Sequence, residues 1–179
     1  FPLTLLANKL VPALAAGNTV IVKPAQTTPL TTKMLLEHLT QAGLPPGVVN
    51  VVLGEAPVGQ ALVSHPDVAM VSFTGSTETG RAIMAGAAGR VKRLALELGG
   101  SDPMIVDADA DVAQAAKATA VGRFFNCGQA CVAVKRVFVH DDVYDEFIDV
   151  LTTRVDKLTI GDGRTPGIFI GPQHTDAQR

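Results

Sequence analysis

Short apolar runs alternate with stretches of helical periodicity along most of the chain, and this alternation limits the fold more than any other feature. The first of these runs, residues 19–22, is β-branched and continuously apolar, as a parallel strand buried on both faces is. Expected strands cover residues 19–22, 48–53, 69–73 and 94–98, and expected helices cover residues 3–16, 29–43, 56–64 and 77–88. The order predicts an α/β protein in which flanking helices cover a parallel sheet.

The alternation continues after Gly99-Gly100, the best candidate for a boundary. Asp109 is expected to cap a long helix that runs from Ala110 towards Phe125. Strands are expected at 104–106 and 135–139, and an amphipathic helix at 143–158. The sequence therefore predicts two domains, 1–99 and 100–179.

Composition narrows the function classes. The net charge is −2 and the basic residues are scattered, so no surface for nucleic acid is expected. The longest apolar runs are too short to span a bilayer, and no membrane partner is expected. Two cysteines do not make a disulfide framework, which favours a reducing, cytoplasmic setting. The chain starts without Met and ends in a loop-like stretch, so we expect an internal fragment of a longer protein.

Cys127 and Cys131 are the chain's thiols, and on a helix their spacing of four would place them on one face. A structural metal would need two further ligands, which no neighbouring residue supplies, so no metal site is expected. The spacing also differs from the two-residue gap of the common thiol–disulfide motif. A thiolate can act as a nucleophile, whereas the plain alternative for either thiol is a small buried core residue.

Glu97 ends an apolar strand just before Gly99-Gly100. A carboxylate in such a setting can activate a water molecule as a general base. The alternative is the polar face of a half-exposed strand. Both interpretations stay open on the residues alone.

The segment from Thr74 to Gly80 reads Thr-Gly-Ser-Thr-Glu-Thr-Gly, follows a strand and opens a helix. Backbone N–H groups at a helix N-terminus, with glycines that permit close approach, suit a pyrophosphate. The three spaced glycines of the dinucleotide fingerprint are missing, as is the end of a nucleoside-triphosphate loop. Spacing alone favours an ordinary capped turn.

Leu96-Glu97-Leu98-Gly99-Gly100 and Gly128-Gln129-Ala130-Cys131 resemble the aldehyde dehydrogenase superfamily, whose general base and nucleophile lie in such motifs. The resemblance extends over nearly the whole chain, to Pro172. It implies the second part of a Rossmann-like cofactor domain joined to the start of a second, catalytic α/β domain. It also implies that Cys131 is the nucleophile, Cys127 a variable neighbour and Glu97 the base. The stretches 91–100 and 155–172 are most similar to the semialdehyde and short aliphatic aldehyde branches.

The same resemblance implies a nicotinamide cofactor. Thr74 would lie beside the nicotinamide, with Gly75 and Ser76 at the phosphates and Leu98 as a further cofactor contact. Lys23-Pro24-Ala25-Gln26 is similar to the family's Lys-Pro-Ala-Glu, in which the Lys and Glu hold ribose hydroxyls. Gln26 replaces a carboxylate that would repel a 2′-phosphate, so the cofactor is NADP or NAD.

The implied reaction is oxidation of a small-molecule aldehyde to a carboxylic acid, by a full-length protein that forms a homo-oligomer. The family's second oxyanion donor would precede Phe1, and a ribose-positioning Glu would follow Arg179, so the chain alone is expected to be inactive. One alternative is an acylating relative that passes the thioester to coenzyme A, although Glu97 argues against it. Another is a non-catalytic cofactor-binding or scaffold fragment.

Overall fold

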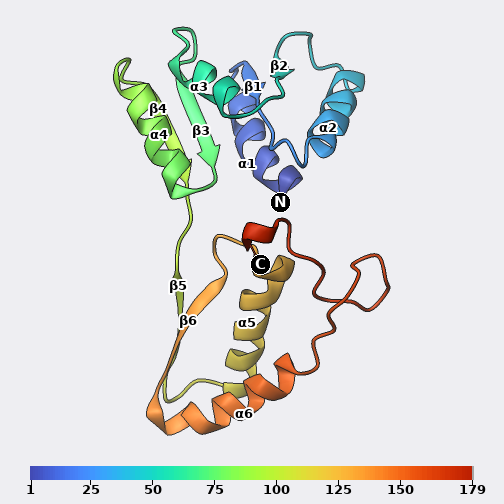
Figure 1. The fold of residues 1–179 in the computed structure, drawn as a ribbon, viewed down its shortest axis with the longest axis vertical. Coiled ribbons are helices and arrows are strands. Elements are labelled where there is room, and N and C mark those ends of the chain that lie inside the picture. The colour runs from blue at the N-terminus through green and yellow to red at the C-terminus, as the bar shows by residue number, and fades with distance from the viewer. Residues whose placement is uncertain (179) are drawn as a thin grey trace. The chain divides into compact units, whose positions relative to one another are not determined.

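The computed structural model describes residues 1–178, and the chain divides into two compact units, Phe1–Leu98 and Gly99–Arg179 (Figure 1). Helices and short parallel strands alternate in both units, which confirms the expected α/β class. Among the described residues, no helix is long and apolar enough to cross a membrane.

Four helices and four strands form the first unit. They are α1 (Pro2–Ala15), β1 (Val20–Val22), α2 (Leu30–Gln41), β2 (Val49–Val51), α3 (Ala56–Ser64), β3 (Met70–Thr74), α4 (Thr77–Ala88) and β4 (Arg93–Glu97). The bounds of α3 and α4 agree with those expected from the sequence. β1 and β2 are shorter than expected, because pairing extends only from Val20 to Val22 and from Val49 to Val51.

The strands of the first unit pair in twos. β1 pairs with β2 and β3 pairs with β4, each in parallel, and a helix connects the strands within each pair. Among the described residues no ladder joins the two pairs, so the single continuous sheet that the alternation suggested is not formed.

The core of the first unit lies between α3, α4 and the β3–β4 pair. Val63 of α3 and Ile83 and Ala87 of α4 are buried together. The half-buried apolar side chains that pack on them from the two strands are Val71, Phe73, Leu94 and Leu96. This packing fixes α4 against β3 and β4, and thereby fixes the turn that joins β3 to α4.

The second unit repeats the strand–helix–strand plan. Its elements are β5 (Asp102–Val106), α5 (Val112–Phe124), the 3₁₀ turn η1 (Phe125–Gly128), β6 (Val134–Val139), the 3₁₀ turn η2 (Asp141–Val143), α6 (Tyr144–Val155) and the 3₁₀ turn η3 (Asp176–Gln178). β5 and β6 are parallel, with an irregularity between Asp102 and Pro103. Phe147 of α6 is buried against Val106 of β5 and Ala116 of α5.

The cap of α5 differs from the expected one. Asp111, not Asp109, is the N-cap residue, and its side chain accepts a hydrogen bond from the amide of Gln114 (2.9 Å). The helix consequently begins at Val112, two residues later than expected. Both aspartates are chemically suited to capping, and Val112 is the residue that packs into the core, so burial of Val112 selects the later start.

Asp111→Ala should lower the free energy of unfolding by about 1 kcal/mol, because it leaves a first-turn amide of α5 without its acceptor. The matched change Asp109→Ala should alter it by less than about 0.5 kcal/mol. Urea titration followed by circular dichroism measures both. Equal effects of the two substitutions would contradict the assignment of the cap.

Candidate active site

Cys131 lies at the corner of a tight turn between η1 and β6. The amide of Ala133 donates to the carbonyl of Ala130 (3.1 Å), so Cys131 and Val132 occupy the two central positions of a β-turn. The Cys131 side chain is exposed. A turn corner thus presents this thiol to solvent, where a core cysteine would be enclosed.

The carbonyl of Cys131 is hydrogen-bonded, whereas in the described structure its amide is not. The Nζ of Lys135 donates to the Cys131 carbonyl (3.0 Å) and to the Ala133 carbonyl (3.1 Å). In the described part of the chain, no group accepts a hydrogen bond from the Cys131 amide. That amide is therefore available to a negative oxygen forming beside the thiol.

Lys135 was not singled out from the sequence. A lysine at the start of a strand is ordinarily a solvated charge, and nothing in its spacing from Cys131 indicates that it folds back onto the turn. Only the structure shows that it fixes the carbonyl of the candidate nucleophile.

Cys127 occupies a different environment from Cys131. It is half-buried, lies in η1 and has a left-handed backbone with φ 58° and ψ 28°. Its sulfur accepts a hydrogen bond from the Gly171 amide (3.2 Å). The two cysteines therefore do not share one face of a helix, because α5 ends at Phe124 and the chain turns between them.

Glu97 is the last residue of β4, opposite Thr74 in the parallel register with β3. Its side chain is exposed within the first unit, so that unit alone does not provide the apolar surroundings suggested by its neighbours in the sequence. Its carbonyl accepts a hydrogen bond from the Gly75 amide (3.0 Å). The backbone of Glu97 is thereby tied to the turn at the start of α4.

The N-terminus of α4 is capped by Ser76. Its hydroxyl accepts from the Thr79 amide (3.2 Å) and donates to the Thr79 hydroxyl (3.0 Å). The amides of Thr77 and Glu78, in the first turn, have no carbonyl partner within the helix and are the donors left for an anion. The Gly75 amide is already used by Glu97, so Gly75 could meet a phosphate only by close approach.

Thr74 provides a direct test of whether this site suits a ligand. Its hydroxyl oxygen is buried, yet it has no hydrogen-bond partner in the described structure. Buried polar groups are nearly always satisfied, so an unsatisfied hydroxyl beside the α4 turn suits a molecule that carries hydrogen-bonding groups. The nicotinamide expected here carries an amide of that kind, and the residues present fit the cofactor.

The remaining predicted cofactor contacts also belong to the first unit. Lys23 follows β1 and is half-buried, and a Cβ added at Gly59 of α3 would lie 3.8 Å from its Cε. Gln26 is exposed three residues further on. Leu98 packs against Gly80 of α4 so closely that a Cβ there would lie 2.7 Å from its Cδ2. Leu98 therefore packs against the first turns of α4. Its contact with a cofactor stays a prediction.

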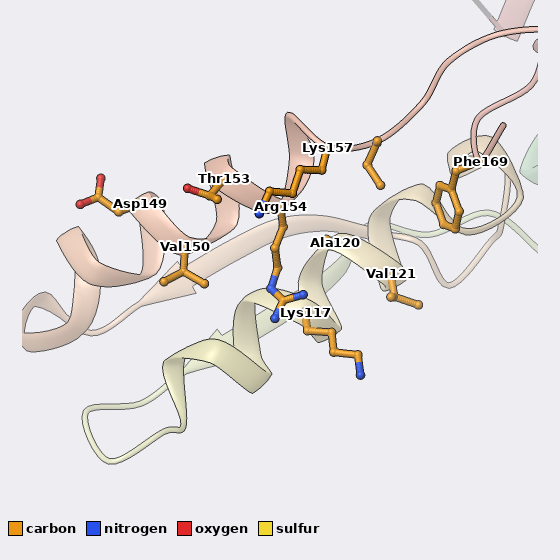
Figure 2. A pocket seen from close by; sticks show the side chains of 10 residues that line it. Lys117, Ala120, Val121, Asp149, Val150, Thr153, Arg154, Lys157 and Phe169 are labelled. Atoms are coloured by element: carbon orange, nitrogen blue, oxygen red, sulfur yellow. The ribbon is translucent and has the colours of Figure 1, made fainter. Parts of the chain in front are cut away.

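One hollow of the second unit is lined by neither cysteine. It is a groove of about 620 Å³ along α5 and α6, shown in Figure 2, with Phe169 at one end and Arg154 extending from α6 towards α5. A smaller hollow of about 370 Å³ is lined by Cys127, Gly128, Gln129 and Gln173, together with Arg123 and Gln178. Within the described residues there is no cluster of three or more potential metal ligands.

Comparison with known families decides the identity of the chain. The model of the aldehyde dehydrogenase family matches residues 1–179. The chain belongs to the aldehyde dehydrogenase family. It is 48% identical over 178 residues to the mitochondrial succinate-semialdehyde dehydrogenase of Arabidopsis thaliana, a match that covers 99% of this chain and 34% of that protein.

Solved structures of this family have the same fold. Succinate-semialdehyde dehydrogenase from Burkholderia pseudomallei matches with a TM-score of 0.96 and 44% identity, over 99% of this chain and 37% of its own. A structure described as an E. coli NADP dependent enzyme matches with a TM-score of 0.93 and 46% identity, over 96% of this chain and 36% of its own. This aldehyde dehydrogenase chain thus spans about a third of the length of these relatives.

Proposed function

We propose that the protein containing this chain oxidises an aldehyde to a carboxylic acid, with Cys131 as the nucleophile and NAD or NADP as the hydride acceptor. The observation that supports this most directly is the Cys131 turn, which combines an exposed thiol with an unpaired amide on the same residue. A thiol and an oxyanion donor at one position are what acyl chemistry at a carbonyl requires.

In the proposed first step the Cys131 thiolate attacks the aldehyde carbon, and a carbon–sulfur bond forms as the carbonyl oxygen becomes negative. The Cys131 amide donates to that oxygen and stabilises it. Lys135 holds the Cys131 carbonyl, which keeps the peptide planes of the turn oriented while the amide donates. The nicotinamide cofactor, which Thr74, Gly75 and Ser76 would hold, would supply the hydride acceptor, and loss of a hydride from the former aldehyde carbon converts the Cys131 adduct to a thioester.

In the proposed second step Glu97 takes a proton from a water molecule, which adds to the thioester. The carbon–sulfur bond then breaks, the carboxylic acid leaves and Cys131 is again a thiolate. A hydrolytic base of this kind would discard the acyl group that an acylating relative transfers to coenzyme A. Hydrolysis is therefore the outcome proposed for this chain.

The setting follows from the chemistry. An exposed nucleophilic thiol must stay reduced, so we place the protein in a reducing compartment such as the cytosol. Homo-oligomer formation by the full-length protein stays an expectation from the family.

Cys131→Ser should abolish aldehyde oxidation by the full-length protein, because a serine hydroxyl ionises far less readily than a thiol and is a much weaker nucleophile. Cys127→Ser should keep most of the activity, since a serine oxygen can still accept the Gly171 amide. Cofactor reduction followed by absorbance measures both variants. Loss of activity in Cys127→Ser with retention in Cys131→Ser would exchange the two assignments.

Glu97→Gln should slow release of the acid more than its formation. A single-turnover burst of reduced cofactor should persist, while steady turnover falls by roughly 10²-fold, the scale for loss of a general base. Stopped-flow absorbance separates the two phases. Disappearance of the burst would place Glu97 in thiol activation or hydride transfer instead.

Gln26 should permit the full-length protein to use NADP at least comparably to NAD. A carboxylate at this exposed position would oppose the 2′-phosphate by on the order of 1 kcal/mol, and Gln26 removes that repulsion while Lys23 stays available as a cation. Gln26→Glu should therefore raise the KM for NADP with little change in kcat. Steady-state kinetics with both cofactors decides it, and a strict NAD preference in the wild type would show that another group excludes the phosphate.

A further inference from the structure

Three consecutive residues before the candidate nucleophile have left-handed backbones. They are Asn126 (φ 50°, ψ 43°), Cys127 (φ 58°, ψ 28°) and Gly128 (φ 74°). Glycine adopts this region freely, but each non-glycine residue held there is strained and persists only where surrounding contacts enforce it. The contacts that enforce it must therefore be found.

Local hydrogen bonds account for part of the restraint. The Gln129 amide donates to the Asn126 carbonyl (3.1 Å), and the Gln129 Nε2 reaches the same oxygen at 3.3 Å. These bonds close a turn from residues within it. They do not connect the turn to the rest of the second unit.

Connection comes from residues 171–174, more than forty positions later in the chain. The Gly171 amide donates to the Cys127 sulfur (3.2 Å), and the Gln173 Nε2 donates to the Cys127 carbonyl (3.0 Å). The His174 amide donates to the Gln129 Oε1 (2.9 Å). Three hydrogen bonds from one short segment thus hold Cys127 by its side chain and backbone, and hold the side chain two residues beyond it.

We propose that residues 171–174 hold the segment 126–131, here called the nucleophile loop, and that Gln173 is a positioning residue for Cys131. This inference rests on the proposed function of Cys131. The Gln173 carboxamide acts through the Cys127 carbonyl, one of the strained positions, and thereby fixes where the chain enters the Cys131 turn. The lysine contact on the far side of that turn fixes where the chain leaves it.

The sulfur of Cys127 gains a role in the same arrangement. It serves as a hydrogen-bond acceptor for the Gly171 amide and is half-buried, so residues 171–174 hold it while Cys131 is presented to solvent. Loss of these contacts should therefore make Cys127 more accessible, and this gives a measure of the loop that does not require catalysis.

The test uses Gln173→Glu in the full-length protein, because this change keeps the shape of the side chain and replaces its donor by an acceptor that opposes the Cys127 carbonyl. The matched control is Gln178→Glu, which makes the same change beside the same small hollow; among the described residues, the Gln178 side chain bonds only to the Thr175 hydroxyl. Iodoacetamide labelling of each cysteine, resolved by peptide mass spectrometry, is measured beside kcat and KM.

In Gln173→Glu we expect labelling of Cys127 to rise about fivefold or more relative to the control, the scale of one lost hydrogen bond. We expect kcat to fall by about tenfold to a hundredfold with the KM for cofactor unchanged, because the thiol is misplaced and the cofactor site is not. A purely structural role would instead lower the unfolding midpoint without changing kcat in the folded protein.

Unchanged Cys127 labelling, or increased labelling with unchanged kcat, would overturn the proposal. If Gln173→Glu does not fold, Gln129→Leu decides, since it removes the acceptor of the His174 amide and should give the same change in labelling. If the wild-type protein oxidised no aldehyde, the proposed function would fail, and the labelling ratio would still decide whether residues 171–174 hold the loop.

Discussion

Parallel pairing of strands is the constraint on which both units depend. Two parallel neighbours cannot be joined by a tight hairpin, so each pair needs a connection that crosses back along the strands. α2, α4 and α5 each provide one, between β1 and β2, β3 and β4, and β5 and β6. The candidate chemistry is placed by these connections: the cofactor turn lies between β3 and α4, and the nucleophile loop lies between α5 and β6.

The two candidate regions use their backbones in opposite ways. At the start of α4 the helix end leaves backbone amides directed outward, which suits an anion. The buried hydroxyl of Thr74 beside it has no hydrogen-bond partner in the described structure. Around Cys131 the backbone is held by hydrogen bonds from Lys135 on one side and from Gly171 and Gln173 on the other. The Cys131 amide and thiol are the groups left available to a ligand. In the proposed function, the α4 region would bind an anion through backbone amides that have no partner in the helix. The Cys131 region would react through a thiol that the turn leaves exposed.

Helix positions could be predicted closely from the sequence, because apolar periodicity and turn residues act over short distances. The bounds of α3 and α4 needed nothing more, and the cap of α5 was wrong by two residues because two aspartates compete and only the burial of Val112 separates them. The strained backbone of Asn126 and Cys127 could not be predicted in this way. It is stabilised by Gly171 and Gln173, and neither residue type nor local spacing indicates a partner so far along the chain.

Cys131 and Glu97 were predicted from their motifs, which carry family information that periodicity does not, and their roles stay predictions. The exposed side chain of Glu97 within the first unit agrees with the alternative of a half-exposed strand, since alternation along a strand directs adjacent side chains to opposite faces. The contact of Lys135 with the Cys131 carbonyl was missed, because a long side chain can fold back in many directions and the sequence specifies none of them.

The hydrogen bond from the Gly75 amide to the Glu97 carbonyl has a consequence for how these two positions can move. Both partners are main-chain atoms, so the bond needs no particular side chain at position 97, whereas at position 75 proline would remove the donor and any Cβ would lie 2.4 Å from the Phe73 ring and force a shift. A shift of the phosphate-side turn is therefore passed to the peptide of the candidate base whatever side chains surround it.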